Sequence, residues 1–273
     1  MKAAQAFIDG MKEFIDVHCH LTGDDYHSVG GVEEVLKRAK EQGVGVIICS
    51  GYDLDSSFEA AELAERHDGL YFCAGFHPGE LHKYKDGDFE RLKALCRHEK
   101  CVAVGEIGFD LHFESNPPKE TQEEFFLRQM QIADELSLPI VVHSRDAAAD
   151  TLRFLKENEG LLKRGGLMHC YSYSPEMLTE FLKLGFYFSF GGPSTFKNAN
   201  KVYESVRRTP TDRLLSETDC PYLTPVPLRG TFPNEPKNVA YVAARLAELK
   251  ETDLEILKEA IAENAKRLFY KVK

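Results

Sequence analysis

Eight short hydrophobic runs alternate with longer amphipathic segments along the chain. The runs are rich in Val, Ile, Phe and Tyr, as is typical of buried parallel strands. They lie at residues 14–20, 44–50, 70–77, 102–108, 139–144, 166–171, 185–190 and 213–219. Apolar residues between the runs recur at helical spacing, so the pattern predicts eight strands that alternate with helices.

Four of the amphipathic segments carry signals for the start of a helix, among them a Ser cap at residues 56–57 and a capping box of Thr252 and Glu255. Ser174 precedes Pro175, which predicts an N-cap followed by proline at the first helical position. Thr121 and Glu124 have the spacing of a capping box, so we expect a helix to begin just after Thr121.

The alternation favours an α/β fold, a single (β/α)₈ TIM-type barrel with its functional site at the C-terminal ends of the strands. A doubly wound sheet stays open as the alternative, although no G-x-G-x-x-G loop follows any of the predicted strands. No linker divides the sequence. We therefore predict one domain over residues 1–273, with residues 1–11 as an N-terminal extension.

Composition and charge narrow the classes of function. Of the 273 residues, 43% are hydrophobic and 29% are charged, which suits a large globular core. The net charge of −10 argues against a broad basic face for duplex nucleic acid, but not against a small site where metals neutralise one phosphate. Seven scattered cysteines without a C-x-x-C pair, and no apolar run of about 20 residues, predict a cytoplasmic protein without a membrane segment. We also expect a monomer.

Titratable side chains gather at the carboxyl ends of the predicted strands. In a barrel these ends form one mouth, where polar groups are costly unless they are paired or bound to metal. The side chains concerned are Asp16, His18, His20, His77, Glu106, His143, His169, Glu217 and Asp219. Several imidazoles and carboxylates converging on one mouth predict a metal site.

The spacing suggests how two divalent ions would be held. His18 and His20 are two residues apart on one strand and can bind one ion from the same side. His143 and His169 end neighbouring strands and can bind a second ion. Glu106 lies between the two pairs in strand order and can bridge both ions. Mg²⁺, Mn²⁺ and Zn²⁺ all accept such ligands, so the identity of the metal stays open.

Three further carboxylates complete the predicted site. Asp219 lies beside the first strand once the barrel closes, where it can bind the first ion and take a proton from the attacking water. Asp219 and Glu106 are therefore the predicted catalytic residues. We expect Asp16 to orient a metal ligand without binding the metal itself, and Glu217 to have a similar supporting role or a structural one.

Six stretches in this order resemble the TatD family of metal-dependent deoxyribonucleases, within the amidohydrolase-like barrels. They are "DVHCHL" (16–21), "GFHP" (75–78), "VGEIGFD" (104–110), "PIVVHSRDA" (139–147), "HCYS" (169–172) and "SETDCPYLTP" (216–225). The resemblance implies a (β/α)₈ barrel, a two-metal phosphodiesterase of 3′–5′ exonuclease type and the same six metal ligands. It also implies that His77 and Arg145 lie close to the substrate phosphate. Thr231, Phe232 and Pro233 stand where basic residues are common before the family's "NEP".

Three functions remain open at this point. The first is metal-dependent hydrolysis of DNA phosphodiester bonds by a metal-activated water, with single-stranded DNA or strand ends as the partner. The second is hydrolysis of small phosphoesters, acyl esters or amides by the same two metals. The third is a barrel whose polar mouth binds a ligand without catalysis.

Overall fold

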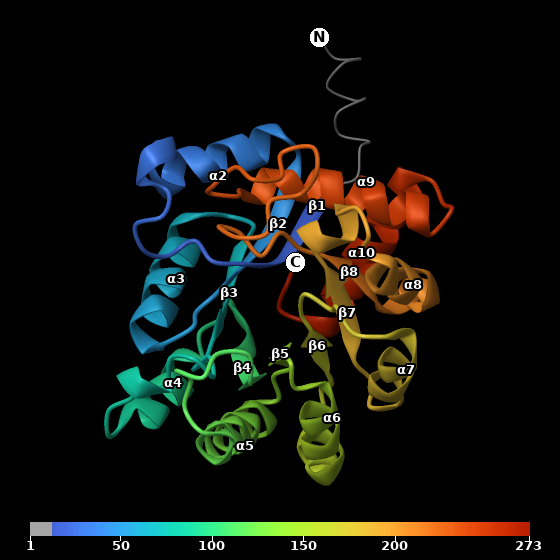
Figure 1. Cartoon of the computed structure of the whole chain (residues 1–273). Helices are drawn as coiled ribbons and strands as arrows, with labels where there is room; N and C mark the ends of the chain where they lie inside the picture. Colours follow the sequence, from blue (N-terminus) through green and yellow to red (C-terminus); the bar gives the residue numbers. More distant parts are fainter. Residues whose placement is uncertain (1–12) are drawn as a thin grey trace.

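The computed structural model describes residues 13–273 (Figure 1), so the predicted extension over residues 1–11 lies outside the described residues. Eight parallel strands form one sheet in the order β1 to β8. Their bounds are β1 Phe14–Cys19, β2 Val44–Ser50, β3 Leu70–Ala74, β4 Cys101–Asp110, β5 Ile140–Arg145, β6 Gly166–Met168, β7 Tyr187–Phe190 and β8 Leu214–Ser216. Each strand pairs with the next one in sequence.

Hydrogen bonds between the first and last strands close the sheet into a barrel. The Ser216 hydroxyl donates to the carbonyl of Ile15 at 2.7 Å. Just beyond the strands, the Asp219 N–H donates to the carbonyl of His18 at 3.0 Å, and the His20 N–H to that of Cys220 at 2.7 Å. Sequential order and this closure confirm the (β/α)₈ barrel, since a doubly wound sheet would reverse its strand order.

Helices surround the strands on the outside of the barrel (Figure 1). They are α2 Gly31–Glu41, α3 Leu54–Arg66, α4 Asp88–Leu95, α5 Lys119–Leu136, α6 Ala148–Glu157, α7 Pro175–Lys183, α8 Asn200–Arg208, α9 Val239–Leu249 and α10 Leu254–Leu268. Their apolar faces pack on the strands. For example, Phe109 of β4 meets Phe126 of α5 and Phe154 of α6, with ring centroids 5.5 Å away in each case. Within residues 13–273, no helix combines the length and the apolar composition needed to cross a bilayer.

Of the four predicted helix starts, the one at Ser174 is confirmed, whereas those at Ser56–Ser57 and Thr252 are wrong because Asp53 and Asp253 cap these helices. The Ser174 hydroxyl accepts a hydrogen bond from the Met177 N–H at 3.4 Å, and Pro175 is the first residue of α7. The capping box predicted at Thr121 is wrong, because α5 begins at Lys119, directly after Pro118, and has no side-chain cap. The helix therefore begins three residues earlier than the Thr–Glu spacing predicts, directly after a proline.

Strands β3, β6 and β8 each end three residues sooner than the hydrophobic pattern predicts, and the last two concern the metal centre. The run 166–171 forms strand only to Met168, and the run 213–219 only to Ser216. Beyond these ends the backbone turns sharply, since Cys170 and Asp219 have positive φ values of 44° and 54°. The backbone no longer pairs with the neighbouring strands here, and the side chains of His169 and Asp219 point into the mouth of the barrel.

Candidate metal centre

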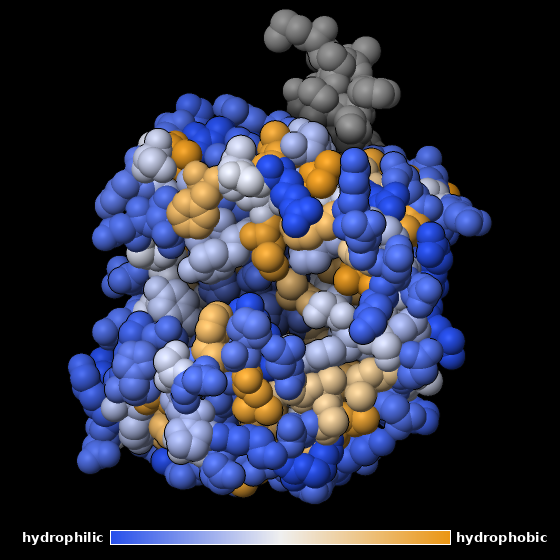
Figure 2. All heavy atoms as spheres, in the orientation of Figure 1, coloured by the Kyte–Doolittle hydropathy of each residue, from blue (hydrophilic) through white to orange (hydrophobic). Residues whose placement is uncertain are grey.

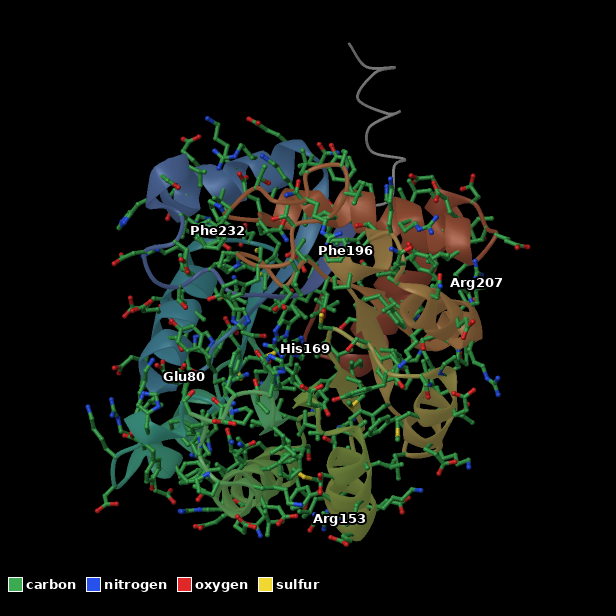
Figure 3. The ribbon with its side chains drawn as sticks, in the orientation of Figure 1. Glu80, Arg153, His169, Phe196, Arg207 and Phe232 are labelled. Carbon is green, nitrogen blue, oxygen red and sulfur yellow. The ribbon has the colours of Figure 1, made fainter. Side chains whose placement is uncertain are left out.

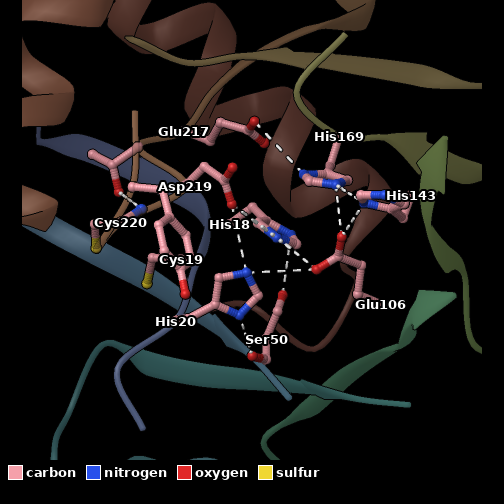
Figure 4. A network of polar contacts seen from close by, with 12 residues as sticks. His18, Cys19, His20, Ser50, Glu106, His143, His169, Glu217, Asp219 and Cys220 are labelled. Carbon is pink, nitrogen blue, oxygen red and sulfur yellow. Dashed lines mark hydrogen bonds and ion pairs between the residues drawn. The ribbon is translucent and has the colours of Figure 1, made fainter. Parts of the chain in front are cut away.

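All six predicted metal ligands meet at the C-terminal end of the barrel (Figure 4). They fall into two groups. Within each group, the nitrogen and oxygen atoms that could bind a metal lie within 4.8 Å of one another. One group contains His18, His20 and Asp219, and the other contains Glu106, His143 and His169. These are the two sets that the strand ends predict.

Glu106 lies between the two groups and faces both. Its Oε1 atom is 2.6 Å from Nδ1 of His143 and 2.8 Å from Nε2 of His169. Its Oε2 atom is 3.3 Å from Nε2 of His18 and 3.5 Å from Nε2 of His20. Because its two oxygens point to different imidazole pairs, this carboxylate has the placement of a bridging ligand.

Asp219 faces the first pair of imidazoles from the opposite side. Its Oδ1 atom is 3.7 Å from Nε2 of His18 and 3.5 Å from Nε2 of His20. Burial alone would raise the pKa of Asp219, but the hydrogen bond from His20 and the neighbouring imidazoles outweigh it and lower the pKa. The carboxyl group is therefore ionised near neutral pH and can accept a proton.

The outer ring nitrogens of two histidines face hydrogen-bond acceptors. Nδ1 of His20 donates to the carbonyl of Ser50 at 2.9 Å, so the lone pair is on Nε2 and points into the centre. Nε2 of His143 lies 3.3 Å from the Asp110 carboxylate, and its Nδ1 lies 2.6 Å from Oε1 of Glu106, so both nitrogens of this ring face carboxylates. An acceptor behind the ring is the usual arrangement for a histidine that binds a metal.

Of the other two histidines, only His18 has the same arrangement, with its Nδ1 3.1 Å from the Ser50 hydroxyl. Nδ1 of His169 is 3.8 Å from Oε1 of Glu217, too far for a hydrogen bond, and the other oxygen of Glu217 accepts the Ser189 hydroxyl at 2.5 Å. Glu217 is fully buried and lies behind His169, which agrees with the supporting role predicted for it.

Burial and the neighbouring charged groups shift the pKa values of the side chains in the centre strongly. Burial and the neighbouring His169 lower the pKa of His18 to about 4. Burial also acts to lower the pKa of His169, but the Glu106 carboxylate outweighs it and raises the pKa to about 10. For Glu106 itself, the imidazoles of His169 and His18 outweigh burial and hold its pKa well below the usual range. A buried carboxylate surrounded by imidazoles favours positive charge at this point.

The donor set fits two divalent cations. Nε2 of His18 is buried and has no hydrogen-bond partner among residues 13–273, although it points into the centre. Nδ1 of His143 and Nε2 of His169 lie only 3.2 Å apart. A cation beside each pair would satisfy these nitrogens together with the carboxylates of Glu106 and Asp219.

The two residues predicted to bind phosphate lie differently. Nε2 of His77 is 3.7 Å from Oε1 of Glu106, and its ring centroid is 4.3 Å from that of His143, so His77 borders the centre. Arg145 is exposed at the end of β5, and its guanidinium carbon is 4.9 Å from the ring centroid of Phe113. The arginine therefore lies at the rim and not among the ligands.

Asp16 supports the centre through the backbone. Its Oδ1 atom accepts the backbone N–H of Thr218 at 2.8 Å and, more weakly, that of His18 at 3.4 Å. Strict alternation along β1 would turn its side chain the same way as His18, but the register of β1 shifts between Asp16 and Cys19. The carboxylate consequently lies beside the thiols of Cys19 and Cys220.

Sequence reasoning missed one residue of the site. Asp110 is buried at the end of β4, four positions after Glu106, where it faces His143. Its place at a strand end is the same signal that identifies the six predicted ligands. The hydrophobic run 102–108 stops two residues before it, so the pattern of apolar runs does not include Asp110.

Comparisons with known proteins agree with this geometry. The family described as TatD related DNase matches residues 15–270. The uncharacterized metal-dependent hydrolase YabD of Bacillus subtilis is 46% identical over 254 residues, which are 93% of this chain and 98% of that protein. YcfH of Escherichia coli K12, also an uncharacterized metal-dependent hydrolase, is 40% identical over 94% of this chain and 95% of its own length.

A solved structure is similar over the same region. The crystal structure of YjjV, a TatD homologue from Escherichia coli K12, has a TM-score of 0.87 and 34% identity. The alignment covers 94% of this chain and 98% of that one. The family match, the close relatives and the barrel with its cluster of histidines and carboxylates lead to one conclusion: this chain belongs to the TatD family of metal-dependent hydrolases.

Proposed function

We propose that this protein hydrolyses DNA phosphodiester bonds with two divalent metal ions at the centre described above. The observation that carries the proposal is Glu106, whose two oxygens face two separate imidazole pairs. His18, His20 and Asp219 would hold one ion and His143 and His169 the other, with Glu106 between them. Two such ions, when bound, polarise a phosphoryl group and lower the pKa of water.

The chain's own residues would then handle the protons. Asp219 is ionised and lies at the centre, so it can accept the proton of the attacking water. His77 is neutral near pH 7, because burial and the neighbouring His143 lower its pKa to about 3. Its Nδ1 accepts the N–H of Gly79 at 3.0 Å, so its proton is on Nε2, which faces the centre. His77 can therefore donate a hydrogen bond to a phosphoryl oxygen through Nε2.

Arg145 has a more distant part in this proposal. Its exposed guanidinium lies at the rim beside the ring of Phe113, where it can meet a phosphate of the approaching strand. We therefore assign it to capture of the substrate and not to the reacting phosphate.

The test is hydrolysis by protein stripped of metal and then reloaded with Mg²⁺, Mn²⁺ or Zn²⁺. The substrates are a 3′-labelled single-stranded oligonucleotide, methyl p-nitrophenyl phosphate and p-nitrophenyl acetate. We expect metal-dependent cleavage of the oligonucleotide and its loss in Glu106→Ala. Cleavage of the acetate ester alone would make the protein an esterase and contradict the assignment to phosphodiesters.

A further inference from the structure

Large hydrophobic side chains are exposed mainly around the mouth of the barrel. Within residues 13–273 ten such side chains are exposed, and six of them follow strand β4 or strand β8. The six are Leu111, Phe113, Tyr222, Leu223, Val226 and Phe232. Figure 2 shows a hollow at the centre of this face with hydrophobic side chains around it, and the label of His169 lies at the same place in Figure 3. Exposed apolar groups gathered at one place indicate a binding surface.

Tyr222 and Phe232 form the most exposed aromatic pair of this group. Their side chains are 55% and 59% exposed, and their ring centroids lie 6.3 Å apart with an angle of 41° between the planes. Both rings come from the segment that joins β8 to α9, although ten positions separate them. Two large rings are therefore held side by side with much of their surface in water.

Hydrogen bonds tie this pair to the metal centre. The N–H of Tyr222 donates to the carbonyl of Asp219 at 3.0 Å, so the tyrosine lies one turn from a predicted metal ligand. The buried side chain of Asn234 donates to the carbonyl of Tyr222 at 2.7 Å, and its N–H donates to the carbonyl of Pro221 at 2.8 Å. The backbone beside each ring is thus held by hydrogen bonds, and that of Tyr222 is tied directly to Asp219.

The charges around the pair disfavour phosphate. Partial burial raises the pKa of the Tyr222 phenol, and the nearby carboxylates of Asp25, Asp219 and Glu80 add to this effect. The whole chain carries a net charge of −10. The phosphates of a nucleic acid would consequently contribute little binding energy here. Aromatic rings, in contrast, stack on bases without needing positive charge.

We propose that Tyr222 and Phe232 are a stacking platform for two unpaired bases of the strand whose phosphate enters the metal centre. This inference rests on the proposed DNA phosphodiesterase function. Bases inside a duplex are covered on both faces by their neighbours, so only single-stranded or frayed ends can use the platform. The platform would set substrate preference without taking part in the chemical step.

The experiment compares Tyr222→Ala and Phe232→Ala with the wild-type protein, all loaded with the same metal. Because the pair lies outside the reacting centre, KM for a single-stranded oligonucleotide should rise about tenfold in each variant, as expected for loss of one stacked base, while kcat stays unchanged. Tyr222→Phe keeps the ring and should restore KM. Tyr270→Ala is the matched control, since Tyr270 is 44% exposed but packs on Arg164 at the opposite end of the barrel.

Two further substrates separate stacking from other effects. Hydrolysis of methyl p-nitrophenyl phosphate, which has no base, should be equal in all variants. An oligonucleotide with abasic residues at its last two positions should raise KM of the wild-type protein about a hundredfold, because two stacked bases are lost, and KM of Phe232→Ala only about tenfold, because one ring remains. A wild-type protein that binds both oligonucleotides equally would overturn the platform.

The outcomes also distinguish this inference from the function on which it rests. If the wild-type protein cleaves no oligonucleotide, the phosphodiesterase proposal fails and the platform fails with it. If it cleaves DNA and both alanine variants have wild-type KM, only the platform is wrong. A change in oligomeric state of the variants by sedimentation, with KM unchanged, would make the pair a contact between copies of the chain and would likewise overturn it.

Discussion

The carboxylate of Asp16 holds Thr218 by two hydrogen bonds, one from its backbone N–H at 2.8 Å and one from its hydroxyl at 2.5 Å. Both residues are buried, and they are 202 positions apart in the sequence. Thr218 directly precedes Asp219, so this contact fixes a predicted metal ligand against the first strand. The site is therefore supported at the seam where the barrel closes.

Asp16→Ala should destabilise the fold. The substitution leaves the N–H and the hydroxyl of Thr218 buried without their partner, so the free energy of unfolding should fall by about 1–3 kcal/mol. Urea denaturation of the metal-free protein measures this. Asp25→Ala is the control, because Asp25 is exposed and should change stability by less than about 0.5 kcal/mol. Equal effects of the two substitutions would contradict a structural role for Asp16.

Glu106→Ala should weaken both metal sites at once. Because each oxygen of Glu106 faces a different imidazole pair, we expect the bound metal to fall from two equivalents towards none, and hydrolysis to fall by at least about a hundredfold. Elemental analysis of the purified variant gives the stoichiometry. His82→Ala, at an exposed position, should retain wild-type metal content. Retention of two equivalents in Glu106→Ala would argue against a bridging carboxylate.

Asp110→Asn should lower metal affinity while leaving the fold intact. The carboxylate accepts from Nε2 of His143, and an amide in its place is a weaker acceptor that no longer strengthens the imidazole as a ligand. We expect a loss of about 10–100-fold in affinity, measured by competition with a chromogenic chelator. Asp146→Asn, an exposed residue paired with His112, serves as control. An unchanged affinity would mean that Asp110 does not orient the ligand.

Asp53→Ala should reduce stability in a pH-dependent way. The carboxylate caps α3 by accepting the Ser56 N–H at 2.8 Å, and it pairs with Lys83 at 2.7 Å. Burial would raise the pKa of Asp53, but these contacts outweigh it and lower the pKa. Since the folded pKa lies below the unfolded value of about 3.9, the contribution is complete above that pH and disappears as the pH falls through the folded pKa.

Urea denaturation at several pH values measures this contribution. At pH 7 the variant should lose about 1–2 kcal/mol, as expected for removal of a helix cap. The difference from the wild-type protein should shrink below about pH 4. Asp55→Ala, in the first turn of the same helix, should have a smaller effect because Asp55 does not cap it. A loss that is constant down to pH 2 would be inconsistent with an ionised cap.

The barrel could be predicted from the sequence because its strands are buried on both faces. Such strands appear as short apolar runs, and all eight of them occur in the structure. The convergence of histidines and carboxylates at one mouth could be predicted for a related reason, since a polar residue such as His143 at the end of an apolar run has few structural explanations. Their pairing follows from strand order alone, which places the residues of β1 and β8 side by side once the barrel closes.

Other features depend on geometry that no local pattern encodes. The Thr121 capping box was wrong because Pro118 ends the preceding segment first. The direction of the Asp16 side chain depends on a register shift in β1, which is set by pairing with β2. The contact of Arg145 with Phe113 depends on the rotamer of an exposed side chain, which residue spacing does not predict.

The closure of the barrel also determines when the metal centre can form during synthesis. His18 leaves the ribosome near the start of translation, whereas Asp219 and its support Thr218 emerge about two hundred residues later. At the usual 5–20 residues per second this is an interval of roughly ten to forty seconds. Until then the imidazoles of β1 lack their carboxylate partner from β8, so the nascent chain cannot assemble the first of the two proposed ion sites. If His18, His20 and Asp219 bind one ion as proposed, loading of that ion would follow folding of almost the entire chain.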